Sequence, residues 1–258
     1  MPDDLTTTSH WDERWQQPQR GKLRQSISPM DSEYLRFLRF ALKNVPQDGH
    51  LLELGGAPGT MLLRQHAARP DLTVDCLDFS PVGVEATKLE YARSGMNGSV
   101  HHADFREWTT GEGRYDVVTS FGLIEHFEDF QSVIRHHFKF CKPGGTVVIT
   151  IPNYGCFPVR NLLRRYSTDI LQTHNLECMS QEALRHAAKD FSTDVITGGT
   201  GSSILPYSRH DRSISGKIYS IAALAFNGMI ALLTLLLFRK VELRIWPTNL
   251  FLIAKARP

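Results

Sequence analysis

Short apolar runs alternate with helical patterns through most of this chain of 258 residues. The apolar runs predict strands at 50–54, 73–77, 99–102, 115–120, 146–151, 192–197 and 249–255. The helical patterns predict helices at 31–46, 60–68, 82–94, 130–141 and 180–189. Strands that alternate with helical patterns in this way form a parallel sheet with helices on its faces. We therefore expect a doubly wound α/β fold around a mostly parallel, seven-stranded sheet.

Charge balance and cysteine content narrow the classes of protein to consider. The 29 basic and 27 acidic residues give a net charge of +2, so the composition does not favour a nucleic-acid partner. The four cysteines form no C-x-x-C pair, which is typical of a reducing compartment. The N-terminal segment is polar and acidic, whereas a secretory signal is basic and then apolar. We expect a cytoplasmic protein.

The turn after the first predicted strand reads ELGGAPGT and contains one carboxylate and three glycines, namely Glu53, Gly55, Gly56 and Gly59. Glycines let a backbone approach a ligand closely, and the helix that follows points free N–H groups at the same place. The dinucleotide motif G-x-G-x-x-G fails here, which argues against a nicotinamide oxidoreductase. The carboxylate of Glu53 would repel a pyrophosphate but attract a cation.

Two further carboxylates follow the next strands. Asp78 ends the second predicted strand, where a carboxylate can accept both ribose hydroxyls, and Asp104 follows the third, where it can accept an adenine amino group. The implied ligand has a ribose, an adenine and a positive charge but no phosphates. S-adenosylmethionine (SAM) meets this description.

Five motifs in order along the chain resemble those of the class I SAM-dependent methyltransferases, in their small-molecule branch. They are the glycine turn at 53–59, LDFS at 77–80, ADF at 103–105, YDVVTSFGLIEH at 115–126 and KPGG at 142–145. The resemblance implies a Rossmann-like methyltransferase sheet with SAM as its cofactor. It also implies that the glycines face the methionine portion, Asp78 the ribose, and Asp104 with Phe105 the adenine. The expected cofactor-binding set further includes Glu53, Phe79 and Phe121. Ala57 replaces the middle glycine of the family's loop.

Two histidines are candidate catalytic bases. A hydroxyl nucleophile gains from a base near neutral pKa, and histidine is the usual choice. His126 ends the fourth-strand motif, and His174 lies in the segment after the fifth strand. Glu-His after the fourth strand, with a later Thr-His, is similar to the ubiquinone-pathway O-methyltransferases. Metal-binding relatives tend to have an acid three residues before the glutamate, where this chain has Gly122, so we expect no metal ion. A structural role for His126 in ordering the loop through Glu125 stays open.

The segment 218–238 contains no charged residue and is long enough for a transmembrane helix. If 249–255 joins the same sheet, however, a single crossing would leave that strand on the far side of the membrane. Asn227 and Gly228 indicate a break between two short helices. Three interpretations stay open: a helical pair that is buried or caps the substrate, a hairpin that dips into a membrane, and a true span.

We expect a single domain over 1–258. It comprises an N-terminal cap at 1–30, where Trp11 and Trp15 pack on a neighbour, a cofactor-binding core at 31–200, a hydrophobic helical insertion at 201–247 and a final strand at 248–258. The predicted activity is SAM-dependent methylation of a small, lipophilic or aromatic acceptor at oxygen. A small-molecule N-methyltransferase and a non-catalytic, membrane-associated SAM-fold protein are the alternatives. The expected partners are this acceptor and, through 218–238, the surface of a membrane, with no nucleic acid.

Overall fold

The computed structural model describes residues 4–16, 29–157, 159–207, 213–236 and 245–258. Those parts of the predicted cap at 1–30, of the insertion at 201–247 and of the apolar segment at 218–238 that fall in the gaps lie outside the described residues.

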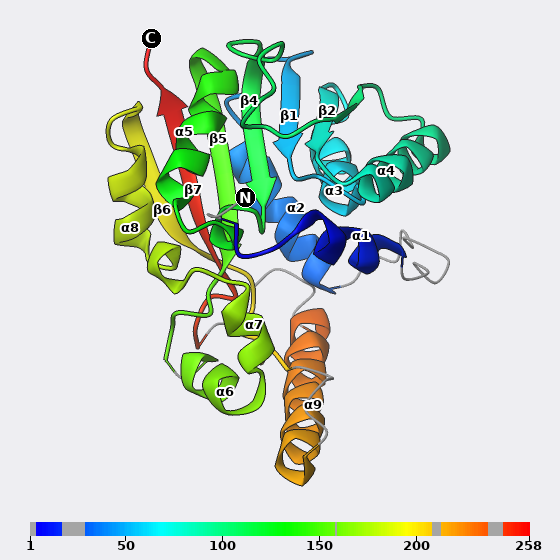
Figure 1. Cartoon of the computed structure of the whole chain (residues 1–258), viewed down its shortest axis with the longest axis vertical. Coiled ribbons are helices and arrows are strands. Elements are labelled where there is room, and N and C mark those ends of the chain that lie inside the picture. Colours follow the sequence, from blue (N-terminus) through cyan, green and yellow to red (C-terminus); the bar gives the residue numbers. More distant parts are fainter. Residues whose placement is uncertain (1–3, 17–28, 158, 208–212, 237–244) are drawn as a thin grey trace.

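One seven-stranded sheet has the order β3-β2-β1-β4-β5-β7-β6 (Figure 1). The strands from β3 to β5 run parallel, whereas β7 is antiparallel to both β5 and β6. The predicted fold class is therefore confirmed. The strands are β1 (His50–Leu54), β2 (Thr73–Asp78), β3 (Val100–His102), β4 (Tyr115–Phe121), β5 (Cys141–Pro152), β6 (Ser192–Thr200) and β7 (Asn249–Ala256).

Helices cover both faces of this sheet (Figure 1). Because side chains alternate across a strand, Leu51 packs into the core on one face and Leu52 into the core on the other. The Leu52 face is covered by α5 (Phe130–Phe140) and α8 (Gln181–Ala188). The Leu51 face is covered by α2 (Pro29–Ala41), α3 (Thr60–Ala68) and α4 (Pro81–Ser94).

The structure differs from the sequence-based prediction mainly at the ends of elements. The predicted helix at 130–141 ends at Phe140, because Cys141 already pairs with Tyr115 as the first residue of β5. The register then shifts, and Thr146 pairs with Val117. The KPGG turn is therefore part of an irregular strand entry rather than a separate loop.

The stretch 153–179, which has no clear sequence pattern, is largely helical. It contains α6 (Val159–Tyr166), α7 (Thr168–Gln172) and the 3-10 turn η2 (Leu176–Cys178), with a second 3-10 turn, η1 (Ile124–His126), beside it. Helices this short depend on tertiary contacts for their stability, so they leave little periodic signal in a sequence.

The apolar segment forms one continuous helix, α9 (Ile214–Leu236), so the predicted break at Asn227 and Gly228 is wrong. A helix tolerates one glycine at a cost of about 1 kcal/mol, and the Asn227 side chain is used elsewhere, since it bonds both the N–H and the carbonyl of Leu205. The interpretation as a buried helical pair is also wrong, because only 22% of the most apolar window of α9 is buried.

A single membrane crossing by α9 does not fit the sheet. Thr200 at the end of β6 pairs with Asn249 at the start of β7, so both ends of the insertion lie side by side at one end of the sheet. The helix is long and apolar enough to cross a membrane by length and composition. The chain must nevertheless leave and return on the same side, as expected from the last strand.

Candidate functional site

A cavity of about 820 Å³ lies at the carboxyl ends of the parallel strands. This is where open α/β sheets bind their ligands, because the connections on either side of β1 diverge there. Of the predicted site residues, the cavity is lined by Gly55, Asp78, Phe79, Asp104, Phe105, Phe121, His126 and His174. Glu53, Gly56 and Gly59 lie outside this lining.

Each of the three glycines in the turn after β1 has a different structural role. Gly55 lines the cavity with a φ of 68°, in the left-handed region that glycine adopts without strain. A Cβ on Gly56 would lie only 2.8 Å from Sγ of Cys76, so this residue allows the turn to pack on β2. Gly59, with a φ of 98°, is the N-cap of α3. Gly56 and Gly59 therefore shape the loop from behind.

Glu53 lies beneath the glycine turn, 2% exposed, and accepts a hydrogen bond of 2.5 Å from Nε2 of Gln65. Burial raises the pKa of Glu53 well above its usual range, despite the bond from Gln65. Direct contact of Glu53 with a cofactor stays a prediction. In the structure its carboxyl group joins β1 to α3.

Asp78 is held by two backbone donors. Its Oδ2 accepts from the N–H of Ala57 at 3.1 Å, and its Oδ1 accepts from the N–H of Ser80 at 2.9 Å. Burial raises its pKa, although these bonds favour the charged form. Asp78 thus connects the glycine turn to the start of α4 while facing the cavity.

Asp104 forms a bidentate pair with Arg106, which donates from Nε to Oδ1 and from Nη2 to Oδ2 and also bonds Asp4 at 2.7 Å. Burial raises the pKa of Asp104, but the bonds from Arg106 outweigh burial, so its net pKa is lowered and the group stays ionised. The rim of the cavity at this point therefore contains a neutralised cation. Phe105 packs against Phe127 here, with ring centroids 5.7 Å apart.

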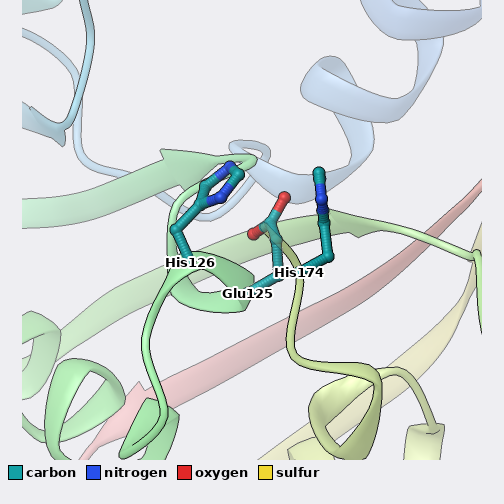
Figure 2. A group of neighbouring side chains, drawn as sticks. All are labelled: Glu125, His126 and His174. Carbon is teal, nitrogen blue, oxygen red and sulfur yellow. The ribbon is translucent and has the colours of Figure 1, made fainter. Parts of the chain in front are cut away.

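Glu125, His126 and His174 also meet at the cavity, each offering one donor atom within 4.8 Å of the others. Figure 2 shows the Glu125 carboxylate between the two rings. Nδ1 of His126 lies 2.7 Å from the carbonyl of Thr173, and Nδ1 of His174 lies 2.6 Å from that of Ile170. Because a carbonyl only accepts, each Nδ1 carries the proton and each Nε2 keeps its lone pair.

Burial sets the charges of this group. It lowers the pKa of His126 to about 3, assisted by the nearby His174, and it also lowers the pKa of His174. Burial raises the pKa of Glu125 to about 8. The imidazoles of His126 and His174 are therefore both neutral at physiological pH. Beside them, the buried Oε2 of Glu125 has no hydrogen-bond partner among the described residues.

A model of a methyltransferase domain matches residues 26–197, which include β1 to β5 and the cavity lining from Gly55 to His174. The chain belongs to this methyltransferase family. Its fold is that of the class I SAM-dependent members, which confirms the family inferred from the five motifs.

Curated relatives match only part of this methyltransferase. Ubiquinone biosynthesis O-methyltransferase of Escherichia coli is 33% identical over 109 residues, and the match spans 40% of this chain and 42% of that protein. The match thus spans less than half the length of such curated relatives.

Two solved structures share the fold. The plantazolicin methyltransferase in complex with S-adenosylhomocysteine (SAH) has a TM-score of 0.58 at 14% identity, covering 97% of this chain and 95% of that one. Phospholethanolamine N-methyltransferase 2 of Haemonchus contortus has a TM-score of 0.58 at 17% identity, covering 98% of this chain and 60% of that one.

The cavity of this methyltransferase fits SAM by its donor set. Asp78 offers a carboxylate for a ribose diol, and Phe79, Phe105 and Phe121 offer aromatic surface for an adenine. Arg106, a cation on this rim, is already paired with Asp4 and Asp104, so its charge is neutralised and would attract a phosphate only weakly. The site therefore suits a positively charged nucleoside better than a dinucleotide.

Sequence patterns missed the helix that covers the cavity, α1 (Thr8–Gln16). Its Trp11 and Trp15 stack with centroids 5.8 Å apart, and Trp11 also meets the ring of His126 edge-on at 5.1 Å. Arg14 of α1 lies over both tryptophan rings and lines the cavity. The helical spacing of Trp11 and Trp15 predicted that they pack on a neighbouring element. In the structure both tryptophans line the cavity, and Trp11 packs on His126.

Proposed function

We propose that this methyltransferase transfers the methyl group of SAM to a hydroxyl oxygen of a small, lipophilic or aromatic acceptor. The observation that carries the proposal is the neutral His126, buried at the cavity with its Nε2 lone pair left available by the Nδ1 bond to Thr173. A neutral imidazole can accept the proton that a hydroxyl must lose, whereas a neutral amine acceptor needs only alignment. Cytoplasmic residence, at the surface of a membrane, is part of the same proposal.

Cofactor binding is assigned to the residues at the ends of β1, β2 and β3. Asp78 would accept the ribose hydroxyls, while Phe79, Phe105 and Asp104 would enclose the adenine. Gly55 lines the cavity where the methionine portion would lie, with Gly56, Gly59 and Glu53 shaping the turn from behind. When bound, the cofactor supplies an electrophilic methyl group on a sulfonium, which is a good leaving group.

His126 takes the acceptor's proton in this scheme. The carbonyl of Thr173 accepts from Nδ1 and so fixes the tautomer that leaves Nε2 free to take the proton, and the Glu125 carboxyl group lies beside the ring. His174 lies 4.6 Å from His126, ring centroid to centroid, and its Nε2 offers a second acceptor for a hydroxyl of the substrate. The two histidines together suit an acceptor with neighbouring oxygens.

The acceptor side of the cavity is mostly aromatic and apolar. Trp11, Phe127, Tyr154 and, from α7, Ile170 line it. Such a lining favours ring stacking and hydrocarbon contact over hydration of the ligand. This composition supports a lipophilic or aromatic acceptor.

Transfer of labelled methyl from SAM to a panel of phenols, catechols and amines tests the proposal. We expect methylated oxygen, and His126→Gln lowers kcat by about a hundredfold or more, the usual contribution of a general base. The exposed His186→Gln on α8 is the matched control and keeps full activity. Asp78→Asn raises the dissociation constant for SAH by about tenfold or more, as expected for losing a charged hydrogen-bond partner.

Three outcomes would contradict this assignment. Methylated amine, with His126→Gln as active as wild type, would favour the N-methyltransferase alternative. Binding of SAH without transfer to any acceptor would favour the non-catalytic alternative. Loss of activity in a chelator, restored by a divalent cation, would show that Glu125, His126 and His174 hold a metal ion instead of acting as a base.

A further inference from the structure

Apart from Lys217 near its start, the outer surface of α9 is apolar. Seven residues on it are between 49% and 80% exposed: Ile214, Ile218, Ile221, Leu224, Met229, Leu232 and Leu236. A helix of 23 residues is about 34 Å long. An exposed apolar surface of this extent is rare on a protein that is surrounded by water alone.

The inner stripe of α9 is fixed to the domain by specific contacts. Tyr219 stacks on Tyr166 of α6 with centroids 4.5 Å apart and donates a hydrogen bond of 2.6 Å to the carbonyl of Pro206. Further along, Phe226 stacks on Trp246. Since these contacts hold one side of the helix, its apolar side is presented outward in a defined orientation.

Positive charge lies beside this surface. The helix α6 carries Arg160, Arg164 and Arg165, all exposed, and has no acidic residue. Phe157, just before α6, is a further exposed apolar side chain, at 77%. Apolar side chains next to several arginines are the combination that binds the interface of an anionic bilayer.

The same region adjoins the cavity through α7. Asp169, Ile170 and Gln172 of α7 line the cavity, and α7 packs on α6, which in turn packs on α9. Figure 1 shows α6, α7 and α9 grouped beyond the carboxyl ends of the strands, on the side of the sheet where the cavity lies. A surface that binds a bilayer here would bring the cavity next to the lipid.

We propose that α9, α6 and Phe157 form a docking surface for an anionic phospholipid bilayer, with α9 lying in the interface rather than crossing it. The β6–β7 pairing supports this orientation because both ends of the insertion return to the same sheet. The proposal rests on the proposed function for its purpose, which is to admit a lipophilic acceptor directly from the membrane. Its binding test requires no activity.

Co-sedimentation with vesicles tests the surface. The full chain should bind vesicles of equal parts phosphatidylcholine and phosphatidylglycerol, and bind pure phosphatidylcholine more weakly. The double variant Ile221→Glu, Leu232→Glu should lower binding by at least about tenfold, because two apolar side chains no longer leave water. Leu89→Glu is the matched control, since Leu89 is 57% exposed on α4, and should bind like wild type.

Charge is tested separately. Arg160→Gln, Arg164→Gln and Arg165→Gln should each weaken binding to the anionic vesicles by about fivefold and leave binding to phosphatidylcholine unchanged. Unchanged vesicle binding in the double variant of α9 would overturn the proposal. So would absence of binding by the wild type, together with a dimer in analytical ultracentrifugation that the double variant abolishes, because α9 would then be covered by a second copy.

Activity distinguishes this proposal from the proposed function. The double variant should keep wild-type kcat and KM with a short-chain, water-soluble phenol, and lose activity with a long-chain alkylphenol embedded in vesicles. Vesicle binding without methylation of any phenol would refute the proposed function but not the docking surface. Methylation of the embedded phenol at equal rates by both proteins would overturn the docking surface and leave the proposed function standing.

Discussion

Neutrality of His126 at ordinary pH is the residue-scale property on which the proposed chemistry depends. Burial, the nearby His174 and more distant positive groups on α1 all lower its pKa, to about 3, and only the carbonyl of Thr173 opposes them. A general base works in its unprotonated form, so a lowered pKa extends activity toward acid, although it also makes His126 a weaker base than a histidine with a pKa near neutral. An exposed histidine would lose its base form below about pH 6.5.

The first prediction therefore concerns the acid limb of the pH–rate profile. We expect kcat for a phenol at saturating SAM to stay nearly constant from pH 7 to pH 5 and to fall only below that. Circular dichroism at each pH separates a loss of activity from unfolding. An acid limb centred near 6.5, with the protein still folded, would show that the base is a solvated histidine and not His126.

Some residues of the site could be predicted from nearby sequence, whereas others depend on contacts between distant segments. Gly55, Asp78, Phe105 and His126 lie at fixed positions after strands, and their arrival at one cavity follows from the parallel sheet. Trp11 and Arg14 reach the same cavity from a helix whose placement depends on packing against α4 and the ring of His126. Such contacts between distant segments leave no periodic pattern, so α1 could not be placed from the sequence.

At the scale of elements, α5 is fixed to the sheet by a buried histidine. His137 is fully buried, with Nδ1 2.8 Å from the carbonyl of Val133 and Nε2 2.8 Å from Oγ of Ser120 on β4. Burial lowers its pKa to about 4. Between pH 6.5 and 4 the unfolded chain binds a proton at this position that the folded chain does not, so acid destabilises the fold in this window.

His137→Gln gives the second prediction. At pH 7 the variant should lose about 1–3 kcal/mol of unfolding free energy, because the partners of a buried hydrogen-bonding group are left incompletely satisfied. The gap from wild type should narrow toward pH 5, since wild type alone loses the contribution of His137. Urea unfolding at both pH values measures this, with His186→Gln as the exposed control. A gap that does not change with pH would contradict the lowered pKa.

Helices and strands could be predicted where the hydrophobic periodicity and the turn-forming residues indicated the same boundary. The first strand, at His50–Leu54, has its predicted bounds, since a buried apolar run is followed directly by a glycine turn. At Asn227 and Gly228 the turn signal was misleading, because Asn227 bonds Leu205 and Gly228 faces open space without ending α9. A turn-forming residue ends a helix only where tertiary contacts stabilise a non-helical backbone conformation at that residue.

On the scale of the whole molecule, the end of the chain completes the sheet. The last strand, β7, lies between β5 and β6 and pairs with both along its length, although a long insertion separates it from β6. Closing a loop of that size costs only a slowly growing entropy, about 0.6 kcal/mol for each doubling of its length. The insertion therefore costs the fold little entropy, and the hydrogen bonds that β7 forms with both β5 and β6 offset that cost.

The third prediction removes that completion. A chain that stops after Thr248 should lose the cooperative thermal transition, because the facing edges of β5 and β6 would be unpaired and Leu250, Leu252 and Ala254 would no longer fill the core. A chain that lacks only the exposed Pro258 should melt like wild type and serves as the control. Circular dichroism melting compares the two. A cooperative transition in the shorter chain, with SAH still bound, would mean that the parallel half of the sheet folds alone, and that β7 serves chiefly to return the insertion to the domain.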